Sequence, residues 1–324
     1  MIKKQGRLTA QIVNSPLFIL PPGYAQLMAK FDQLGCQSGR IENSFKLTRV
    51  GITELVKPVV VRRQGRDHHL TAHVDVFVDL PSTQRGSHMS RNVEVITEVI
   101  EDSLKKKVES LEQLAANICR RLLDRHDYAS YAEVRMTADY FLDRTTSSGR
   151  KSVEPYKLMA KATSTRGNGL MKQVGVEVMG MTACPCAMET VAQELGLDRA
   201  DLNRIRSKAP MISHNQRNRT TLMVEVPEHV DVEADDLIDI VESSQSSPTF
   251  GILKRSDEAA VVLRAHQNPK FVEDVVRDIL GKLLKKYKKL DDSVHVTVRS
   301  ESEESIHKHN AFAERITTLG ELRR

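Results

Sequence analysis

The sequence predicts an α+β protein that combines antiparallel strands with paired helices. Three observations support this class. Residues 70–80 alternate strictly between apolar and polar side chains, which is typical of a strand with one buried face. Two amphipathic helical segments follow directly, and a looser version of the same order recurs later in the chain.

The first half is predicted to run strand, strand, helix, helix, strand, strand. The strands are expected at 46–63, 70–80, 131–143 and 156–165, and the helices at 91–106 and 110–125. Within 70–80 the alternation predicts which side chains face the core. The residues expected to be buried are Leu70, Ala72, Val74, Val76, Val78 and Leu80.

The second half repeats this order less clearly. Strands are expected at 173–179, 220–226 and 293–299, and helices at 234–244 and 269–289, the last capped by Asn268. A segment rich in Ser, Thr and Gly at 163–169 is expected to separate the halves. We therefore predict an N-terminal arm at 1–45, a first module at 46–165 and a second module at 166–324.

Composition narrows the class of function. The 48 basic and 43 acidic residues give a net charge of +5, which suits an anionic small molecule as well as nucleic acid. The chain lacks the clustered aromatic residues that stack on bases, and no apolar run approaches the length of a membrane-spanning helix. The four cysteines (Cys36, Cys119, Cys184 and Cys186) have no disulfide-framework spacing. We expect a cytoplasmic protein that partners neither nucleic acid nor membrane.

Two thiols and an imidazole stand out in this cysteine-poor chain. Cys184 and Cys186 flank Pro185, whose fixed backbone angle makes a disulfide between them awkward. His214 opens a His-Asn-Gln-Arg segment further along. Thiolate and imidazole are ligands of transition metals, but a Cys-x-Cys pair alone also fits ordinary buried cysteines. Both readings stay open on these residues alone.

A carboxylate falls at the edge of an apolar helical face. On a helical wheel Glu273 lies near Leu280 and Leu284, so it is expected to be desolvated unless it finds donors. It could reach solvent along the helix surface or pair with Arg277 one turn later. Alternatively, it could accept two N–H groups from a ligand such as guanine.

Histidines supply two further candidates. His307 and His309 lie two residues apart near the C-terminus, either incidentally or as an acid/base pair that titrates near neutral pH. His88 precedes a predicted helix that begins with Ser90 and Arg91. Helix N-terminal amides and an arginine suit a phosphate, although capping by Ser90 explains the same residues.

Taken in order, these motifs resemble those of a known enzyme family. The motifs are Leu80-Pro81-x-x-Gln84-x-Gly86-x-His88-Met89-Ser90-Arg91, Cys184-Pro185-Cys186, His214-Asn215-Gln216-Arg217, Leu253-Lys254-Arg255-Ser256-Asp257-Glu258, Asn268-Pro269-Lys270-Phe271-Val272-Glu273-Asp274 and Glu304-Ser305-Ile306-His307-Lys308-His309. As an ordered set, spread over roughly residues 46–314, they are similar to the GTP cyclohydrolase family of the bacterial type IB and archaeal MptA enzymes. Any one of them alone would be weak.

The resemblance implies the tunnelling fold (T-fold), in which two strand-strand-helix-helix-strand-strand modules per chain assemble into β-barrels ringed by helices. It also implies a homo-oligomer, a dimer or tetramer, with active sites between subunits. The implied metal ligands are Cys184, His214 and Glu258. The other implied site residues are Glu273 at the purine edge, Arg91, Lys254 and Arg255 at the triphosphate, and His307, His309 and Cys186 in catalysis.

The implied reaction opens the imidazole ring of GTP at C8 and releases formate. One divalent metal per subunit would activate the attacking water, while the histidines move protons. Fe(II) is favoured, and the ligand types also suit Zn(II) or Mn(II).

Two departures from the bacterial pattern favour the archaeal type. Segment 187–213 is long, and Ser246-Ser247-Pro248-Thr249-Phe250 stands where bacterial members carry a Cys-Glu pair. Archaeal members form 7,8-dihydroneopterin 2′,3′-cyclic phosphate for tetrahydromethanopterin, and bacterial members form 7,8-dihydroneopterin triphosphate for folate. We therefore expect the cyclic phosphate. Two remote alternatives are a nitrile reductase of the same fold, with a cysteine nucleophile and a nicotinamide cofactor, and a non-catalytic RNA-binding protein.

Overall fold

A computed structural model describes residues 41–63, 66–105, 108–206 and 208–324. Residues 1–40 of the predicted arm, including Cys36, lie outside the described part of the chain. Within that part, no helix combines the length and the hydrophobicity needed to cross a membrane.

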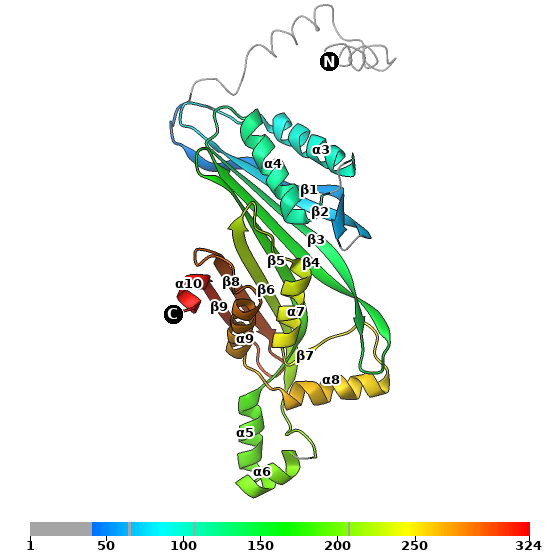
Figure 1. Ribbon diagram of the computed structural model, residues 1–324. Helices are drawn as coiled ribbons and strands as arrows, with labels where there is room; N and C mark the ends of the chain where they lie inside the picture. The colour runs from blue at the N-terminus through cyan, green and yellow to red at the C-terminus, as the bar shows by residue number, and fades with distance from the viewer. Residues whose placement is uncertain (1–40, 64–65, 106–107, 207) are drawn as a thin grey trace, which may run out of the picture.

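One antiparallel sheet of nine strands runs through the described chain (Figure 1). Eight strands neighbour one another in sequence order: β1 (Leu47–Arg63), β2 (Arg66–Leu80), β3 (Tyr131–Thr145), β4 (Lys151–Thr165), β5 (Gly169–Ala183), β6 (Asn215–Pro227), β8 (His295–Glu303) and β9 (Ala311–Thr318). The short β7 (Ser247–Pro248) pairs with β5 instead. The expected separation at 163–169 is a tight turn that joins β4 to β5 within this sheet, so the division into two domains stays a prediction.

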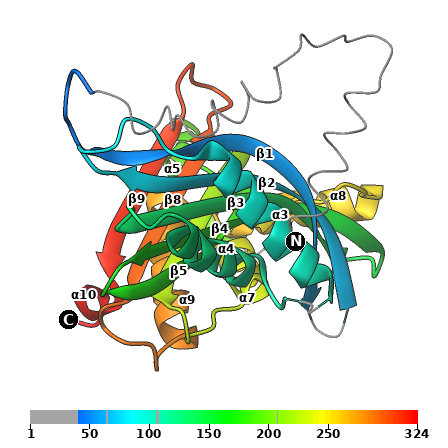
Figure 2. The same cartoon turned by 90° about the horizontal axis from the view of Figure 1, so that it is seen from above.

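Helices pack on both halves of the sheet (Figures 1 and 2). The first half carries α3 (Met89–Lys105) and α4 (Leu111–Arg125), and the second half carries α7 (Ala234–Ser244) and α9 (Val272–Lys286). One hydrophobic core continues beneath both pairs. The α+β class and the order strand, strand, helix, helix, strand, strand are therefore confirmed for the first half, and the second half follows the same order with insertions.

The insertions lie close to the predicted site residues. Helices α5 (Pro185–Glu194) and α6 (Arg199–Arg206) come between β5 and β6 and project from the end of the sheet in Figure 1. Helix α8 (Arg255–Gln267) comes between β7 and α9, and the short α10 (Leu319–Leu322) follows β9. None of these four helices, nor β7 and β9, was predicted from the sequence.

Strand β2 shows why the alternation was informative. All six apolar side chains expected in the core are at most 7% exposed. The exception to the pattern is Asp79, which was expected on the polar face but is buried. It accepts hydrogen bonds from the backbone amides of Ser130 (2.7 Å) and Tyr131 (2.8 Å) and pairs with Lys46 (3.0 Å). Burial alone would raise the pKa of Asp79, but these donors outweigh it and hold the pKa below its usual range.

The start of α9 differs from its prediction. Phe271, rather than Asn268, occupies the N-cap position, and its amide donates to the carboxylate of Asp274 at 3.1 Å. Asn268 instead ends α8, and its side-chain amide donates to the carbonyl oxygen of Gln245 (3.2 Å). Asn268 is therefore used to hold the segment before β7.

Candidate functional site

Two predicted metal ligands meet where β5 and β6 adjoin. Ala183, the last residue of β5, pairs with Asn215, the first residue of β6. The amide of Cys184 donates to the carbonyl oxygen of His214 (3.1 Å), and the Ser213 hydroxyl donates to the carbonyl oxygen of Cys184 (2.6 Å). The strand register therefore brings Cys184 and His214 next to each other on neighbouring strands.

Cys184 also begins a helix. It is the N-cap of α5, Pro185 takes the first helical position, and the amide of Ala187 donates to the Cys184 sulfur at 3.5 Å. Cys186, two residues on, is exposed, and both thiols are free.

The orientation of His214 is fixed by an amide and a carboxylate. The side-chain nitrogen of Gln216 donates to Glu304 (3.2 Å), so the Gln216 oxygen faces His214 Nδ1 at 3.0 Å. A second Glu304 oxygen lies 3.8 Å from the same nitrogen. In the neutral imidazole these acceptors favour the tautomer with the proton on Nδ1 and the lone pair on Nε2, which is the usual arrangement of a metal-binding histidine.

Two more imidazoles, those of His307 and His309, lie next to His214. His307 and His309 lie on the exposed connection between β8 and β9. The rings of His214 and His307 meet edge to face with centroids 6.5 Å apart, and His307 stacks on His309 at 5.0 Å. The structure thus groups four of the predicted site residues, namely Cys184, His214, His307 and His309.

The predicted third metal ligand is not in this group. Glu258 is exposed on α8, and the described residues contain no cluster of three metal-binding side chains. The opposite end of α8 does reach the site, because His266 Nε2 lies 3.1 Å from the carbonyl oxygen of Ser213. Glu258 lies about two turns earlier on the helix. One chain therefore supplies two donors, a thiol and an imidazole, whose types fit a borderline-soft divalent metal.

The basic candidates are divided between two places. Lys254 and Arg255 are exposed at the start of α8, close in sequence to Glu258. Arg91 belongs to α3, a helix that Figure 1 shows at the opposite end of the sheet from α8. Its side chain donates to the carbonyl oxygen of Arg125 at 3.1 Å. Burial and the charge of Arg91 lower the pKa of His88, which makes its neutral form more prevalent.

The expected desolvation of Glu273 is wrong. Glu273 is exposed in the first turn of α9, and Arg277 pairs with Asp274 (3.0 Å) instead of with Glu273. The wheel placed Glu273 beside residues that are buried further along the helix, but within the described chain no element covers the first turn on that side. Its carboxylate makes no hydrogen bond or ion pair within the described chain, which leaves it accessible to a ligand.

A buried polar network beneath the site was missed. Along β6, buried side chains change from apolar at one end to Gln216, Asn218 and Thr220 towards the site. The Asn218 amide donates to the hydroxyls of Ser300 (2.9 Å) and Ser302 (3.0 Å) on the neighbouring β8. Polar residues at alternating, otherwise apolar positions could have revealed this network, because buried hydroxyls and amides must pair with one another.

Gln245 joins this network to β5. Its side-chain nitrogen donates to Asn218 Oδ1 (3.1 Å), and its side chain packs directly on Gly180. A Cβ atom at position 180 would overlap the Gln245 amide. Position 180 therefore requires glycine, because the Gln245 side chain occupies the space that a Cβ atom would fill.

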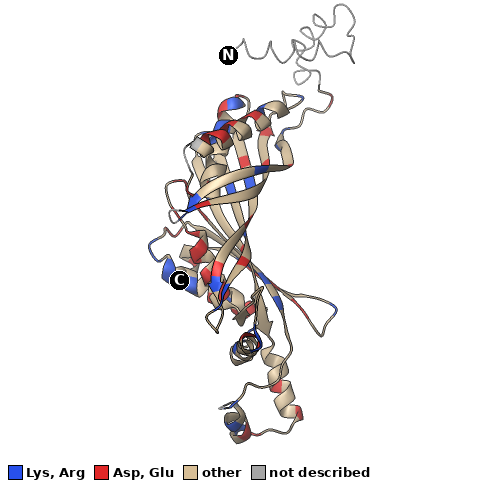
Figure 3. Ribbon diagram, turned by 90° about the vertical axis from the view of Figure 1, so that its right-hand side faces the viewer, with Lys and Arg blue, Asp and Glu red and all other residues tan. Residues whose placement is uncertain are grey.

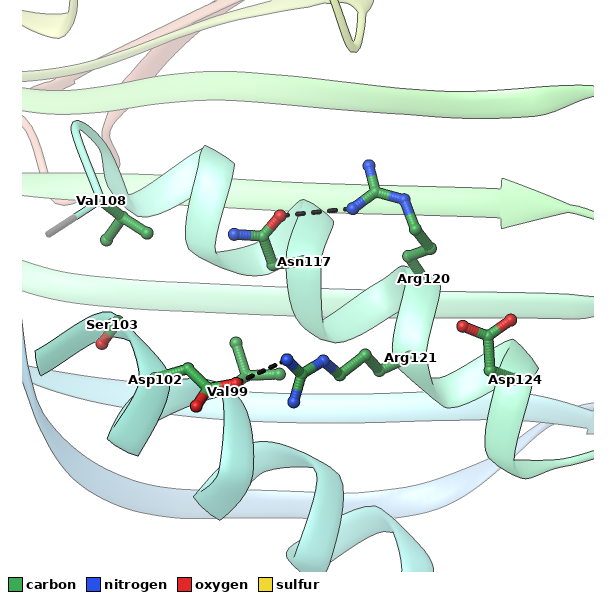
Figure 4. Close-up of a pocket in the computed structure, with 8 residues that line it drawn as sticks. All are labelled: Val99, Asp102, Ser103, Val108, Asn117, Arg120, Arg121 and Asp124. Carbon is green, nitrogen blue, oxygen red and sulfur yellow. Dashed lines mark hydrogen bonds and ion pairs between the residues drawn. The ribbon is translucent and has the colours of Figure 1, made fainter. Parts of the chain in front are cut away.

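A separate cavity of about 610 Å³ lies between α3 and α4 (Figure 4). Its arginines are already paired with carboxylates, Arg121 with Asp102 (2.6 Å) and Arg120 with Glu228. Figure 3 shows the same interspersion of basic and acidic residues over these helices. None of the predicted site residues lines this cavity, and its two arginines are paired with carboxylates, so it is not the candidate site.

Comparison with known proteins identifies relatives along most of the chain. The family model described as type I GTP cyclohydrolase folE2 matches residues 35–313. GTP cyclohydrolase MptA of Methanothermobacter thermautotrophicus is 47% identical over 288 residues, covering 86% of this chain and 91% of that protein. GTP cyclohydrolase MptA of Methanosarcina mazei is 43% identical over 303 residues, covering 89% and 95%. Among solved structures, a uricase from Bacillus fastidious aligns with a TM-score of 0.49 at 10% identity, over 87% of this chain and 96% of that chain. A structural likeness of that size says nothing about activity.

Proposed function

This chain belongs to the type I GTP cyclohydrolase folE2 family, and from that membership we propose the specific reaction that it catalyses. It is a GTP cyclohydrolase of pterin biosynthesis. The proposed reaction opens the guanine imidazole ring at C8, releases formate and forms 7,8-dihydroneopterin 2′,3′-cyclic phosphate with release of pyrophosphate. The observation that carries this proposal is the junction of Cys184 and His214 beside two further imidazoles, in a chain whose relatives are named GTP cyclohydrolase MptA.

We propose that Cys184, His214 and Glu258 hold one divalent metal, with Fe(II) favoured over Zn(II) or Mn(II). Bound there, the metal would supply a Lewis acid and lower the pKa of a water molecule. Gln216 and Glu304 accept at and beside His214 Nδ1 and so leave Nε2 for this role, and Cys184 stands at the N-terminal end of α5. Within the described chain the Glu258 carboxylate makes no ion pair, so it is available as the oxygen ligand.

His307 and His309 are the proposed proton carriers. Both are exposed and contiguous with His214, so an imidazole can reach a purine held at the Cys184–His214 junction. One imidazolium would protonate the ring nitrogen that leaves C8. The accessible thiol of Cys186 is the third candidate in this step.

Substrate recognition is proposed for charged residues around this centre. The Glu273 carboxylate would accept two guanine N–H groups, and Lys254, Arg255 and Arg91 would neutralise the phosphates. Formation of the cyclic phosphate requires a ribose hydroxyl to attack the α-phosphate in line with departing pyrophosphate. The protein must therefore hold the phosphate chain rigidly.

We also propose a homo-oligomer, a dimer or tetramer, with active sites between subunits. Support comes from the placement of Arg91 far from Cys184 and of Glu258 outside the thiol–imidazole group, because a second copy can supply what one chain leaves apart. A cytoplasmic location is proposed because Cys119, Cys184 and Cys186 are free thiols.

The test is anaerobic turnover of GTP with Fe(II), followed by mass analysis of the pterin and assay of the released phosphates. Formate, stoichiometric pyrophosphate and a monophosphorylated pterin are expected. A pterin that retains three phosphates would overturn the cyclic product and favour the bacterial-type reaction for folate. Metal-free, NADPH-dependent turnover of a nitrile would favour the reductase instead.

A further inference from the structure

The hairpin of β3 and β4 reaches past the first half of the sheet and holds part of the site in the second half. Its tip lies beside α8 in Figure 1. Two buried carboxylates make the connection. Glu154 of the hairpin binds the segment before the exposed Lys254 and Arg255, and Asp257, which follows them, binds the hairpin tip. Asp257 lies within one of the sequence motifs, but neither carboxylate was given a role from the sequence.

The first carboxylate is Asp257, which is 1% exposed. It accepts hydrogen bonds from the Ser147 hydroxyl (2.8 Å), the Ser148 amide (2.8 Å) and the Ser148 hydroxyl (2.9 Å), all at the hairpin tip. It also accepts the amide of Lys254 at 3.2 Å, which caps the start of α8. Asp257 thus fixes the first turn of α8, where Glu258 stands, to the hairpin.

The second carboxylate is Glu154 on β4. Both of its oxygens accept the amide of Gly251, at 2.9 and 3.1 Å, and the Ser152 hydroxyl donates to one of them. Glu154 is 6% exposed. The segment 251–258 is therefore attached to the hairpin at both of its ends.

Packing alone cannot fix this segment. Of the residues of α8, only Asp257 and Ala265 are buried, whereas the apolar Val262 and Leu263 are exposed. A helix with so little apolar burial depends on polar contacts for its position. The described polar contacts at its N-terminal end are those of Asp257.

We propose that Asp257 and Glu154 are positioning residues that hold Lys254, Arg255 and Glu258 in place for the reaction. The inference rests on the proposed function, which gives those three residues their roles. Neither of these two carboxylates is expected to touch substrate, because Asp257 is buried against the hairpin and Glu154, on the hairpin itself, is buried beneath segment 251–258.

The chain offers a matched control for Asp257. Asp79 is 4% exposed and accepts the same kinds of donor, a serine hydroxyl (2.5 Å) and two backbone amides, from Ser130 and Tyr131. Asp257→Asn and Asp79→Asn therefore each remove one buried charge that accepts hydroxyl and amide donors, and Asp79 has Lys46 as an additional partner. Ser147→Ala combined with Ser148→Ala is a milder version that leaves Asp257 and the Ser148 amide in place.

The experiment compares these full-length variants by thermal unfolding, by GTP turnover with Fe(II) and by hydrogen–deuterium exchange of the peptide 249–260. Both Asp→Asn variants should lose a similar amount of stability. Only Asp257→Asn should lower kcat at least tenfold below Asp79→Asn and speed exchange of that peptide at least fivefold. The double serine variant should show the same changes at smaller size.

Two results would overturn the inference. One is unchanged exchange of 249–260 in Asp257→Asn, and the other is faster exchange with kcat within twofold of Asp79→Asn. If the unaltered protein does not turn over GTP, the proposed function fails by itself. The exchange comparison then still decides whether Asp257 holds the segment, and unchanged exchange rejects it.

Discussion

The backbone amide of Cys184 donates a hydrogen bond to the carbonyl oxygen of His214, with a distance of 3.1 Å. The bond continues the β5–β6 ladder one step beyond the paired strands, so main-chain pairing alone places the two residues next to each other. A substitution of either side chain should therefore leave the other in place. This makes single-residue tests at this junction informative.

The first prediction concerns the thiol. Cys184→Ala should abolish GTP turnover and lower the bound metal, because it removes a thiolate ligand without altering the backbone bond to His214. Metal content by mass spectrometry and anaerobic turnover are the measurements. Cys119→Ala, at a buried thiol whose pKa burial raises to about 12, is the control and should keep its metal. Full activity of a rigorously metal-free preparation would contradict the assignment.

The second prediction concerns recognition of guanine. Glu273→Gln replaces two acceptors with one acceptor and one donor, so GTP binding should weaken by about 1–3 kcal/mol while the fold persists. Calorimetry with GTP measures the change. Glu94→Gln, at an exposed carboxylate of α3, should bind GTP as the unaltered protein does. Equal affinities for the two variants would rule out the role of Glu273.

The third prediction tests the packing of Gln245 on Gly180. Gly180→Ala should push the Gln245 amide off Asn218 and destabilise the protein by about 1–3 kcal/mol, measured by urea unfolding. Adding Gln245→Ala should recover part of the loss, because the added methyl group then has space. The control Gly281→Ala lies in open space on α9 and should stabilise by up to about 1 kcal/mol. A neutral Gly180→Ala would show that the described contact does not constrain this strand.

The fourth prediction concerns pH. His126 is buried between Asn92 and Tyr128, and burial, followed by the charge of Arg91, lowers its pKa from 6.5 to about 4. Between these values the unfolded chain binds a proton that the folded chain does not. Stability from this residue is complete above about pH 6.5 and is lost as the pH falls towards 4, by at most about 3 kcal/mol.

The check is the free energy of urea unfolding at pH 7, 5.5 and 4.5. His126→Gln should show a shallower decline than the unaltered protein, because it removes the group that takes up the proton. His73→Gln, at an exposed histidine of β2, should keep the original slope. Parallel curves for His126→Gln and the unaltered protein would refute the account.

The sequence predicted the fold best where a strand or helix had one buried apolar face. Alternation in β2 identified its core side chains, and the bounds of α7 matched the prediction. Strand β9 was missed because Phe312 and Ile316 are exposed at the edge of the sheet, which blurs the period of two. Helix α8 was missed because its apolar residues form no buried stripe.

Prediction of the site was limited by tertiary contacts. Motifs brought Cys184 and His214 to attention, but only the β5–β6 register shows that they adjoin. The supporting residues Gln216 and Asp257 lie inside the same motifs, yet nothing local shows that one orients an imidazole and the other binds a distant hairpin. Metal binding by Cys184, His214 and Glu258 and substrate binding by Glu273 stay predictions.

The agreement between strand order in the sheet and strand order in the chain has a consequence for biosynthesis. From β1 to β6, each strand pairs with the strand that precedes it in the chain. The next strand of this row, β8, pairs with β6 after α7, β7, α8 and α9 have been made. A growing chain can therefore add each new strand to an edge that already exists while the ribosome is still at work. The last strand to emerge, β9, completes the edge without rearrangement of any earlier pair.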